Sequence, residues 1–184
     1  MIIQKLTLDE LQQKICKNKK YRQLIEAFQT NKLYNIPLEN YKEEILALHQ
    51  VRQVRTLIKF CDDSSLNMVD GIIRSNMQDQ GQRSRLAEIH LQCIRASSAL
   101  SDAIKVFKDY ALVRYDSYLS KIRTKGERSI FIDTCLADMQ VYLSNCDLVI
   151  NLTKIVIDDI DKAGWSIERT IKALSLTQVT ERKV

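Results

Sequence analysis

The sequence contains few residues that turn a chain: among its 184 residues there are four glycines and one proline. A many-stranded β protein needs such residues at most of its turns, so their shortage argues against a sandwich or barrel and favours a few long helices. Charged residues interrupt every apolar segment before about 18 positions, too early for a transmembrane span. The stretch MIIQKLTLDELQQ turns polar too soon for a signal peptide. We therefore expect an all-α cytoplasmic protein, in the host cytoplasm if it is viral, with no membrane partner.

The sequence also lacks the motifs of catalysis and of metal or cofactor binding. It has no glycine-rich phosphate loop, no nucleophile elbow, no HExxH motif and no Cys/His spacing typical of zinc. His49 and His90 have no partner motif. The scattered cysteines fit small buried side chains in a reducing compartment better than disulfides or metal ligands. These cysteines are Cys16, Cys61, Cys93, Cys135 and Cys146. We predict no enzymatic activity, no catalytic residue, no metal and no cofactor.

Charge is segregated along the chain, whose net charge is +5. Residues 1–32 and residues 104–128 each carry seven Lys or Arg against three acids, whereas residues 133–161 carry six aspartates and one lysine. Such segregation fits either an anion-binding surface or complementary packing between helices. The acidic run closes with three aspartates near an expected helix end, where they oppose the helix dipole. We expect a positive partner for them, for instance in the basic N-terminal or C-terminal segments.

Apolar spacing predicts an N-terminal helical subdomain over 1–80. It contains a helix over 7–30, begun by a capping box of Thr7 and Glu10, and a second helix over about 40–60. A shorter helix follows, and the sequence around Gly81 reads as a soft junction.

Beyond this junction, apolar positions recur every seven residues in two interleaved series. The series are Leu86, Cys93, Leu100, Phe107 and Ile89, Ala96, Ala103, Tyr110. They predict a coiled-coil-like helix whose apolar seam is interrupted at Arg114. A second apolar seam predicts a helix over 129–163, and Gly126 marks the turn between the two helices. We therefore predict a long antiparallel helical hairpin over 81–163.

The C-terminal region, 164–184, is predicted to hold a short helix and a tail, with Gly164 ending the long helix before it. Trp165 either wedges the corner against its own hairpin or anchors a neighbouring subunit. The second hairpin helix has more apolar surface than one partner helix covers, so we expect both the N-terminal helices and other subunits to contact it. We predict an oligomer interface at Trp165, Ile167 and Ile171.

The stretch YALVRYDSYLSKIRTKGERS, residues 110–129, combines basic and aromatic residues. On one continuous helix, Arg114, Tyr118, Lys121 and Lys125 fall at i, i+4, i+7 and i+11 and would share a face over roughly 16 Å. Cations so placed can follow a phosphodiester backbone, and tyrosine rings can stack unpaired bases. A solvated helix end explains the pattern equally well. The candidate nucleic-acid-binding residues are Arg114, Tyr115, Tyr118, Lys121, Arg123, Lys125 and Arg128.

Two short motifs resemble the UvsY-type recombination mediators of T-even-like phages. ALVRYDSYLSK (111–121) is similar to a Lys-Ala-Arg-Leu-Asp-Tyr-Tyr pattern of that family, although Leu112 stands where the family has its lysine. IDDIDKAGWSIERTIKAL (157–174) resembles the end of the family's second helix. The matching residues are Arg114, Asp116, Tyr118, Ile160, Gly164, Trp165, Ile167 and Ile171. The resemblance, over about residues 85–176, implies a ring-like homo-oligomer that binds single-stranded DNA. Such a protein helps load a RecA-like recombinase onto DNA covered by a single-strand-binding protein, in recombination and repair.

Two alternatives remain open on the sequence. A phage small-terminase-like packaging ring would use the basic segment KICKNKKYR (14–22) as its DNA surface, although that segment lacks a clear helix-turn-helix glycine. A helical adaptor or structural protein would bind a partner helix and no nucleic acid.

Overall fold

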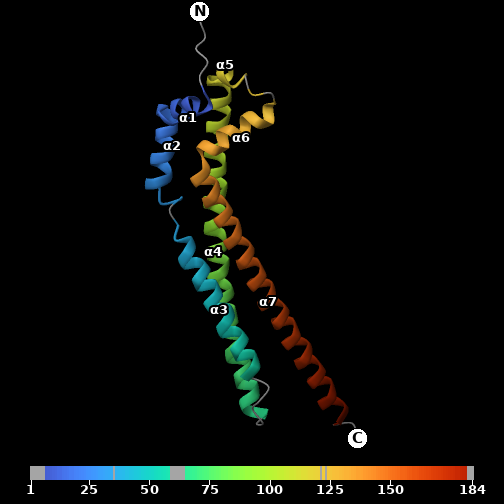
Figure 1. The fold of residues 1–184 in the computed structure, drawn as a ribbon. Coiled ribbons are helices and arrows are strands. Elements are labelled where there is room, and N and C mark those ends of the chain that lie inside the picture. The colour runs from blue at the N-terminus through green and yellow to red at the C-terminus, as the bar shows by residue number, and fades with distance from the viewer. Residues whose placement is uncertain (1–6, 35, 59–64, 121, 123, 182–184) are drawn as a thin grey trace, which may run out of the picture. The chain divides into compact units, whose positions relative to one another are not determined.

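The computed structural model describes residues 7–34, 36–58, 65–120, 122 and 124–181, with side chains over 7–34, 36–52, 71, 73–120, 122, 124–169 and 172. Within these ranges the chain forms seven helices and no strand, which confirms the predicted all-α class (Figure 1). No helix in this part of the chain is long and apolar enough to cross a membrane. The helices are α1 (Leu8–Cys16), α2 (Lys19–Thr30), α3 (Leu38–Ile58), α4 (Ser65–Arg114), α5 (Asp116–Leu119), α6 (Lys125–Cys135) and α7 (Ala137–Glu181).

Contacts divide the chain into two compact units. Unit 1 comprises Met1–Pro37 and Gln92–Leu148, and unit 2 comprises Leu38–Leu91 and Val149–Val184. Each unit therefore combines an N-terminal segment with parts of the two long helices α4 and α7. The sequence-based division at residue 80 coincides with neither unit.

The two long helices are continuous where the sequence predicted breaks. α4 passes through Gly81 without a junction, and α7 passes through Gly164, so the short C-terminal helix is not a separate element. Neither glycine has the positive φ that a C′ position requires. A glycine inside a helix costs only about 1 kcal/mol relative to alanine. A cost of this size does not end a helix of 45 or 50 residues, and both helices continue through these positions.

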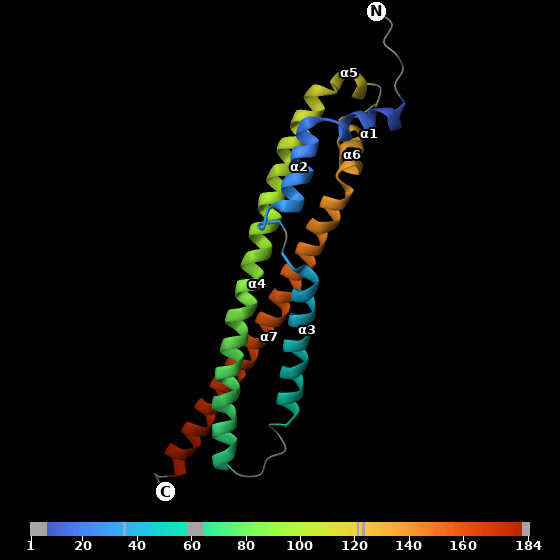
Figure 2. The same cartoon turned by 90° about the vertical axis from the view of Figure 1, so that its left-hand side faces the viewer.

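Unit 1 buries an apolar cluster between α1, α4, α5, α6 and the start of α7, and α2 lies alongside α4 (Figure 2). On α4 the first seven-residue series stays buried through Phe107, but the second departs after Ala96. Ile104 and Ala111 are buried in place of Ala103 and Tyr110, and the stripe continues to Tyr115. The predicted interruption at Arg114 is thus wrong, because an α-helix of 3.6 residues per turn drifts by about 20° per heptad. The buried stripe moves past Arg114, whose side chain is exposed.

Two predicted helix boundaries in unit 1 are also corrected. The helix expected over 7–30 is broken at Asn18, whose side chain accepts from the Lys20 N–H and caps α2. The predicted capping box of Thr7 and Glu10 is confirmed for α1. The helix predicted over 129–163 is divided in the structure: α6 begins before residue 129, with Thr124 in another capping box, and ends at Cys135, and α7 begins at Ala137. Gly126 consequently lies inside α6 rather than in a turn.

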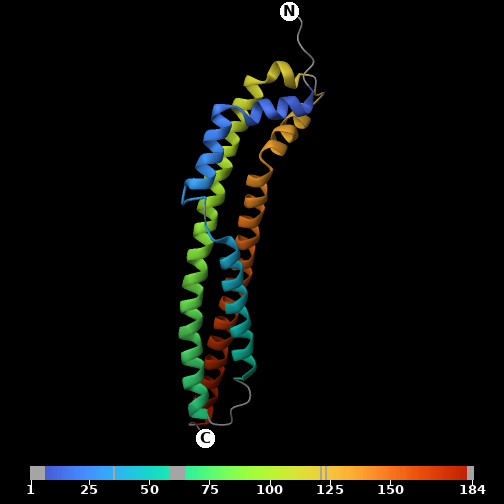
Figure 3. The same ribbon diagram turned by 60° about the vertical axis from the view of Figure 1, so that its left-hand side comes forward.

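Unit 2 packs α3 against its parts of α4 and α7, with ion pairs between the helices (Figure 3). Arg83 of α4 pairs with Asp161 of α7 at 2.7 Å. Arg52 of α3 is only 7 % exposed. It bonds the Asp159 carboxylate, donates to the Asp159 carbonyl at 2.9 Å and lies 3.7 Å from the Asp79 carboxylate. These two arginines are partners of the acidic run, in place of the terminal basic segments expected from the sequence.

Candidate nucleic-acid interface

The basic segment 14–22 lies against three tyrosines of unit 1: Tyr110 of α4, Tyr115 between α4 and α5, and Tyr118 of α5. We call this contact the lysine–tyrosine junction. It comprises Lys14, Asn18, Lys20, Tyr110, Tyr115 and Tyr118. Residues some 90 to 100 positions apart in the sequence thus meet on one surface. The two basic segments that the sequence left as rival DNA surfaces, 14–22 and the stretch after Tyr110, contact each other here.

On the α5 side of the junction, Lys14 contacts Tyr118 twice. Its Nζ lies 4.3 Å from the centroid of the ring and donates to the phenol oxygen at 3.0 Å. The hydrogen bond from Lys14, and the charges of Lys14 and Arg114, lower the pKa of Tyr118. The exposed Arg114 therefore lies close enough to add to the positive potential around this tyrosine.

On the α4 side, Asn18 and Lys20 hold Tyr110 and Tyr115. The Nζ of Lys20 lies 3.9 Å from the Tyr110 ring centroid. The Asn18 amide donates to the phenol of Tyr110 at 3.2 Å and to that of Tyr115 at 2.9 Å. Because Asn18 also caps α2, the same side chain starts this helix and fixes the segment to α4.

Around the junction, segment 14–22 presents five exposed cations and no acid. Among the side chains that the structure describes, no carboxylate pairs with Lys17, Lys19, Arg22 or Arg114. Unpaired cations concentrated in this way raise the local positive potential and attract anions. The arrangement offers positive charge and hydrogen-bond donors.

The nucleic-acid-binding residues predicted from the sequence lie on different helices and differ in exposure. Arg114 is exposed at the end of α4, Tyr118 is half-buried in α5, and Lys125 is exposed at the start of α6. These three do not share one helical face, because α4 ends at Arg114 and α6 is a separate helix. Lys121 and Arg123 lie outside the described residues.

Two predicted contact residues have structural roles. Tyr115 is only 5 % exposed and packs in the core of unit 1, so its ring is not placed to stack a base. Arg128 donates through Nε to the Ile122 carbonyl at 3.1 Å and pairs with Asp116 at 3.4 Å. Arg128 therefore fixes the connection between α5 and α6, and part of its charge is neutralised.

The sequence analysis did not predict that Lys14, Asn18 and Lys20 contact the tyrosines of the same surface. The excess of cations in 14–22 was a signal, but nothing local to it identifies the tyrosines as its contact. The cap at Asn18 could also have been predicted, because asparagine is a common N-cap residue.

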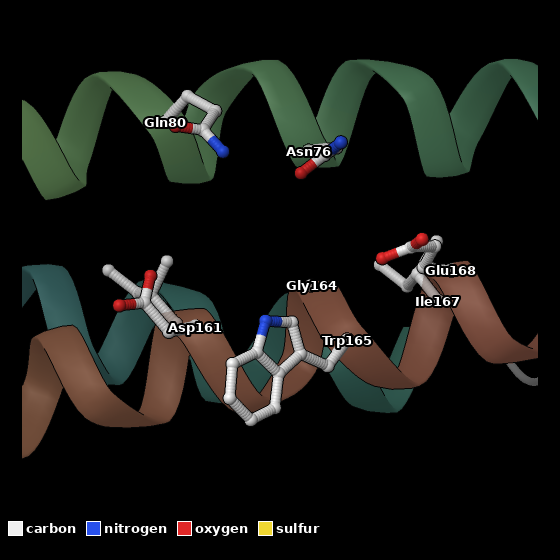
Figure 4. Close-up of a pocket in the computed structure, with 8 residues that line it drawn as sticks. Asn76, Gln80, Asp161, Gly164, Trp165, Ile167 and Glu168 are labelled. Atoms are coloured by element: carbon white, nitrogen blue, oxygen red, sulfur yellow. The ribbon is translucent and has the colours of Figure 1, made fainter.

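A shallow pocket of about 360 Å³ in unit 2 contains the predicted interface residue Trp165 (Figure 4). Its other lining residues are Asn76, Gln80, Ile160, Asp161, Gly164, Ile167 and Glu168. Trp165 is 66 % exposed, so it does not wedge tightly against its own hairpin. The side chain of Ile171 lies outside the described residues. The role of Trp165, Ile167 and Ile171 in subunit contact stays a prediction.

Within the described part of the chain, no three His, Cys, Asp or Glu side chains come together as a possible metal site. Comparison with family models, curated proteins and solved structures finds no match to this chain.

Proposed function

We propose that this protein is a non-enzymatic nucleic-acid-binding protein and that unit 1 binds the phosphate backbone. The observation that carries the proposal is the contact of segment 14–22 with Tyr110, Tyr115 and Tyr118, which flank Arg114 in the sequence, at a surface where exposed cations have no acidic partner among the described residues. Lys and Arg that neutralise phosphates release condensed counterions, which gives sequence-independent affinity. The lysine–tyrosine junction supports this role because it holds two of the lysines in place before a ligand arrives.

In its specific form, the proposal is an oligomeric recombination mediator that binds single-stranded DNA and helps load a RecA-like recombinase. The support for this form is the resemblance around Arg114 and Tyr118, both of which lie at the surface described above. The proposed partners are then a recombinase, a single-strand-binding protein and further copies of the chain.

The second candidate function is a packaging ring that binds duplex DNA. The connection between α1 and α2 favours this function. The connection is short, and Lys19, Lys20 and Arg22 are exposed in the first turns of α2. A helix N-terminus with exposed cations is a common contact for a duplex backbone.

The test is a fluorescence-anisotropy titration of labelled single-stranded and duplex oligonucleotides at several salt concentrations. The test variant combines Lys17→Ala, Lys19→Ala and Arg22→Ala. The matched control combines Lys154→Ala, Lys162→Ala and Arg169→Ala, which removes the same charges from exposed positions in unit 2.

We expect the test variant to bind more weakly and its salt slope for single strands to fall by up to about 2, since each phosphate contact contributes about 0.7. The control should keep the wild-type slope. Equal losses in both variants, or no salt-dependent binding by the wild type, would contradict the proposal; the second result would leave the adaptor alternative. Tighter binding to duplex at equal salt would favour the packaging ring.

A further inference from the structure

We infer that the nucleic acid is recognised through its phosphates alone, without stacking of bases on the tyrosines of the junction. The inference rests on the proposed function and deepens it. The ligand is then any phosphodiester chain, whatever its bases. This departs from the usual single-strand strategy, in which bases stack on open aromatic faces.

The half-buried Tyr118 ring is one candidate platform for a base. Lys14 lies over this ring at 4.3 Å from the centroid and also donates to its phenol at 3.0 Å. A base could stack on that face only by displacing Lys14 and breaking both contacts. A phosphate needs no such displacement, because an ammonium group has three donors and this hydrogen bond to Tyr118 uses one.

The rings of Tyr110 and Tyr115 are engaged as well. Lys20 lies over the Tyr110 ring at 3.9 Å, and the ring of Phe107 lies 6.4 Å from it, centroid to centroid. Tyr115 is buried, accepts from Asn18 and donates to the Lys14 carbonyl at 3.5 Å. All three tyrosines thus serve to fix the basic segment to α4 and α5.

Each cation–π contact orients an ammonium group at the protein surface while the ring's negative face stabilises it. The rings therefore act as supports for phosphate-binding lysines. The cations that remain unpaired, such as Lys17 and Lys19, carry no ring contact in the described structure and add to the same potential.

Abasic oligonucleotides separate the two modes of recognition, because they keep the phosphates and lack the bases. The experiment titrates the wild-type protein with labelled oligothymidylate of about 16 nucleotides and with an abasic strand of equal length, at two salt concentrations. We expect dissociation constants within about threefold of each other and the same salt slope.

A loss of about tenfold or more on the abasic strand would overturn the inference while leaving the proposed function intact, since one stacked base accounts for such a factor. Absence of binding to either strand would overturn the proposed function together with the inference. As a second readout, Tyr118→Leu should weaken binding to both strands equally by releasing Lys14. A loss confined to oligothymidylate would mean that Tyr118 does stack a base.

Discussion

Lys20 lies over the ring of Tyr110, with its Nζ 3.9 Å from the ring centroid, although 90 positions separate the two residues. Through this contact the start of α2 is held on α4. An exposed cation–π contact is worth about 0.5–1 kcal/mol. The same lysine thus contributes to the stability of unit 1 and to its positive surface.

Substitution of Lys20 should separate these two contributions. Lys20→Met keeps the apolar stem and removes the charge, so the free energy of unfolding should fall by about 0.5–1 kcal/mol. Lys19→Met removes an exposed neighbouring charge without a ring contact and should leave stability unchanged. Urea denaturation measures both, and both should weaken nucleic-acid binding to a similar degree. Equal stability of the two variants would show that the Lys20–Tyr110 contact contributes nothing in solution.

Substitution of Gly164 tests whether α7 is continuous or ends at this residue. No atom lies within 4 Å of the position that a Cβ would occupy there. In a continuous helix, Gly164→Ala should therefore raise the free energy of unfolding by about 0.5–1 kcal/mol. At a C′ position with positive φ the same substitution would be strained and destabilising. Thermal unfolding followed by circular dichroism gives the sign of the change directly.

Arg52 should be the most sensitive ionic residue of unit 2. Its replacement by methionine leaves the carboxylate of Asp79 buried without this charge. Because Asp159 is about half exposed, we expect the free energy of unfolding to fall by about 3 kcal/mol, the lower end of the range for a broken buried ion pair. Arg83→Met is the control: its pair with Asp161 is partly exposed, and the loss should stay below about 1 kcal/mol. Similar losses in the two variants would contradict the assigned burial of Arg52.

Stability of unit 1 should fall at alkaline pH through Tyr21, whose phenol donates to the Cys135 carbonyl at 2.8 Å. Burial, with a smaller effect of the Cys16 thiol, raises the pKa of Tyr21 from 10.0 to about 12. Between these two values the unfolded chain releases a proton that the folded chain retains. The free energy of unfolding therefore falls as pH rises through this range, and the contribution is complete below the unfolded pKa. Urea titrations across the range should show a shallower decline for Tyr21→Phe than for the wild type. An unchanged pH slope in the variant would exclude Tyr21 as the source.

The periodic features of the chain were predictable from the sequence, and the junction was not. Helical class, the apolar faces of α4 and α7 and the Thr7 cap follow from local spacing. The register of the buried stripe beyond Leu100 depends on helical drift over several turns, and a glycine such as Gly164 costs a helix too little to fix where α7 ends. The contacts of Lys14 and Lys20 with tyrosines join distant segments, and no local pattern encodes such a pairing.

The most direct test of the central claim, that segment 14–22 and Arg114 form one phosphate-binding surface, compares the salt dependence of two variants. One combines Lys17→Ala, Lys19→Ala and Arg22→Ala, and the other is Arg114→Ala. The measurement is the slope of log affinity against log salt for one single-stranded oligonucleotide. The account predicts a lower slope for both variants, by up to about 0.7 for each cation removed. A slope that falls in one variant and stays at the wild-type value in the other would show that the two segments do not share a ligand.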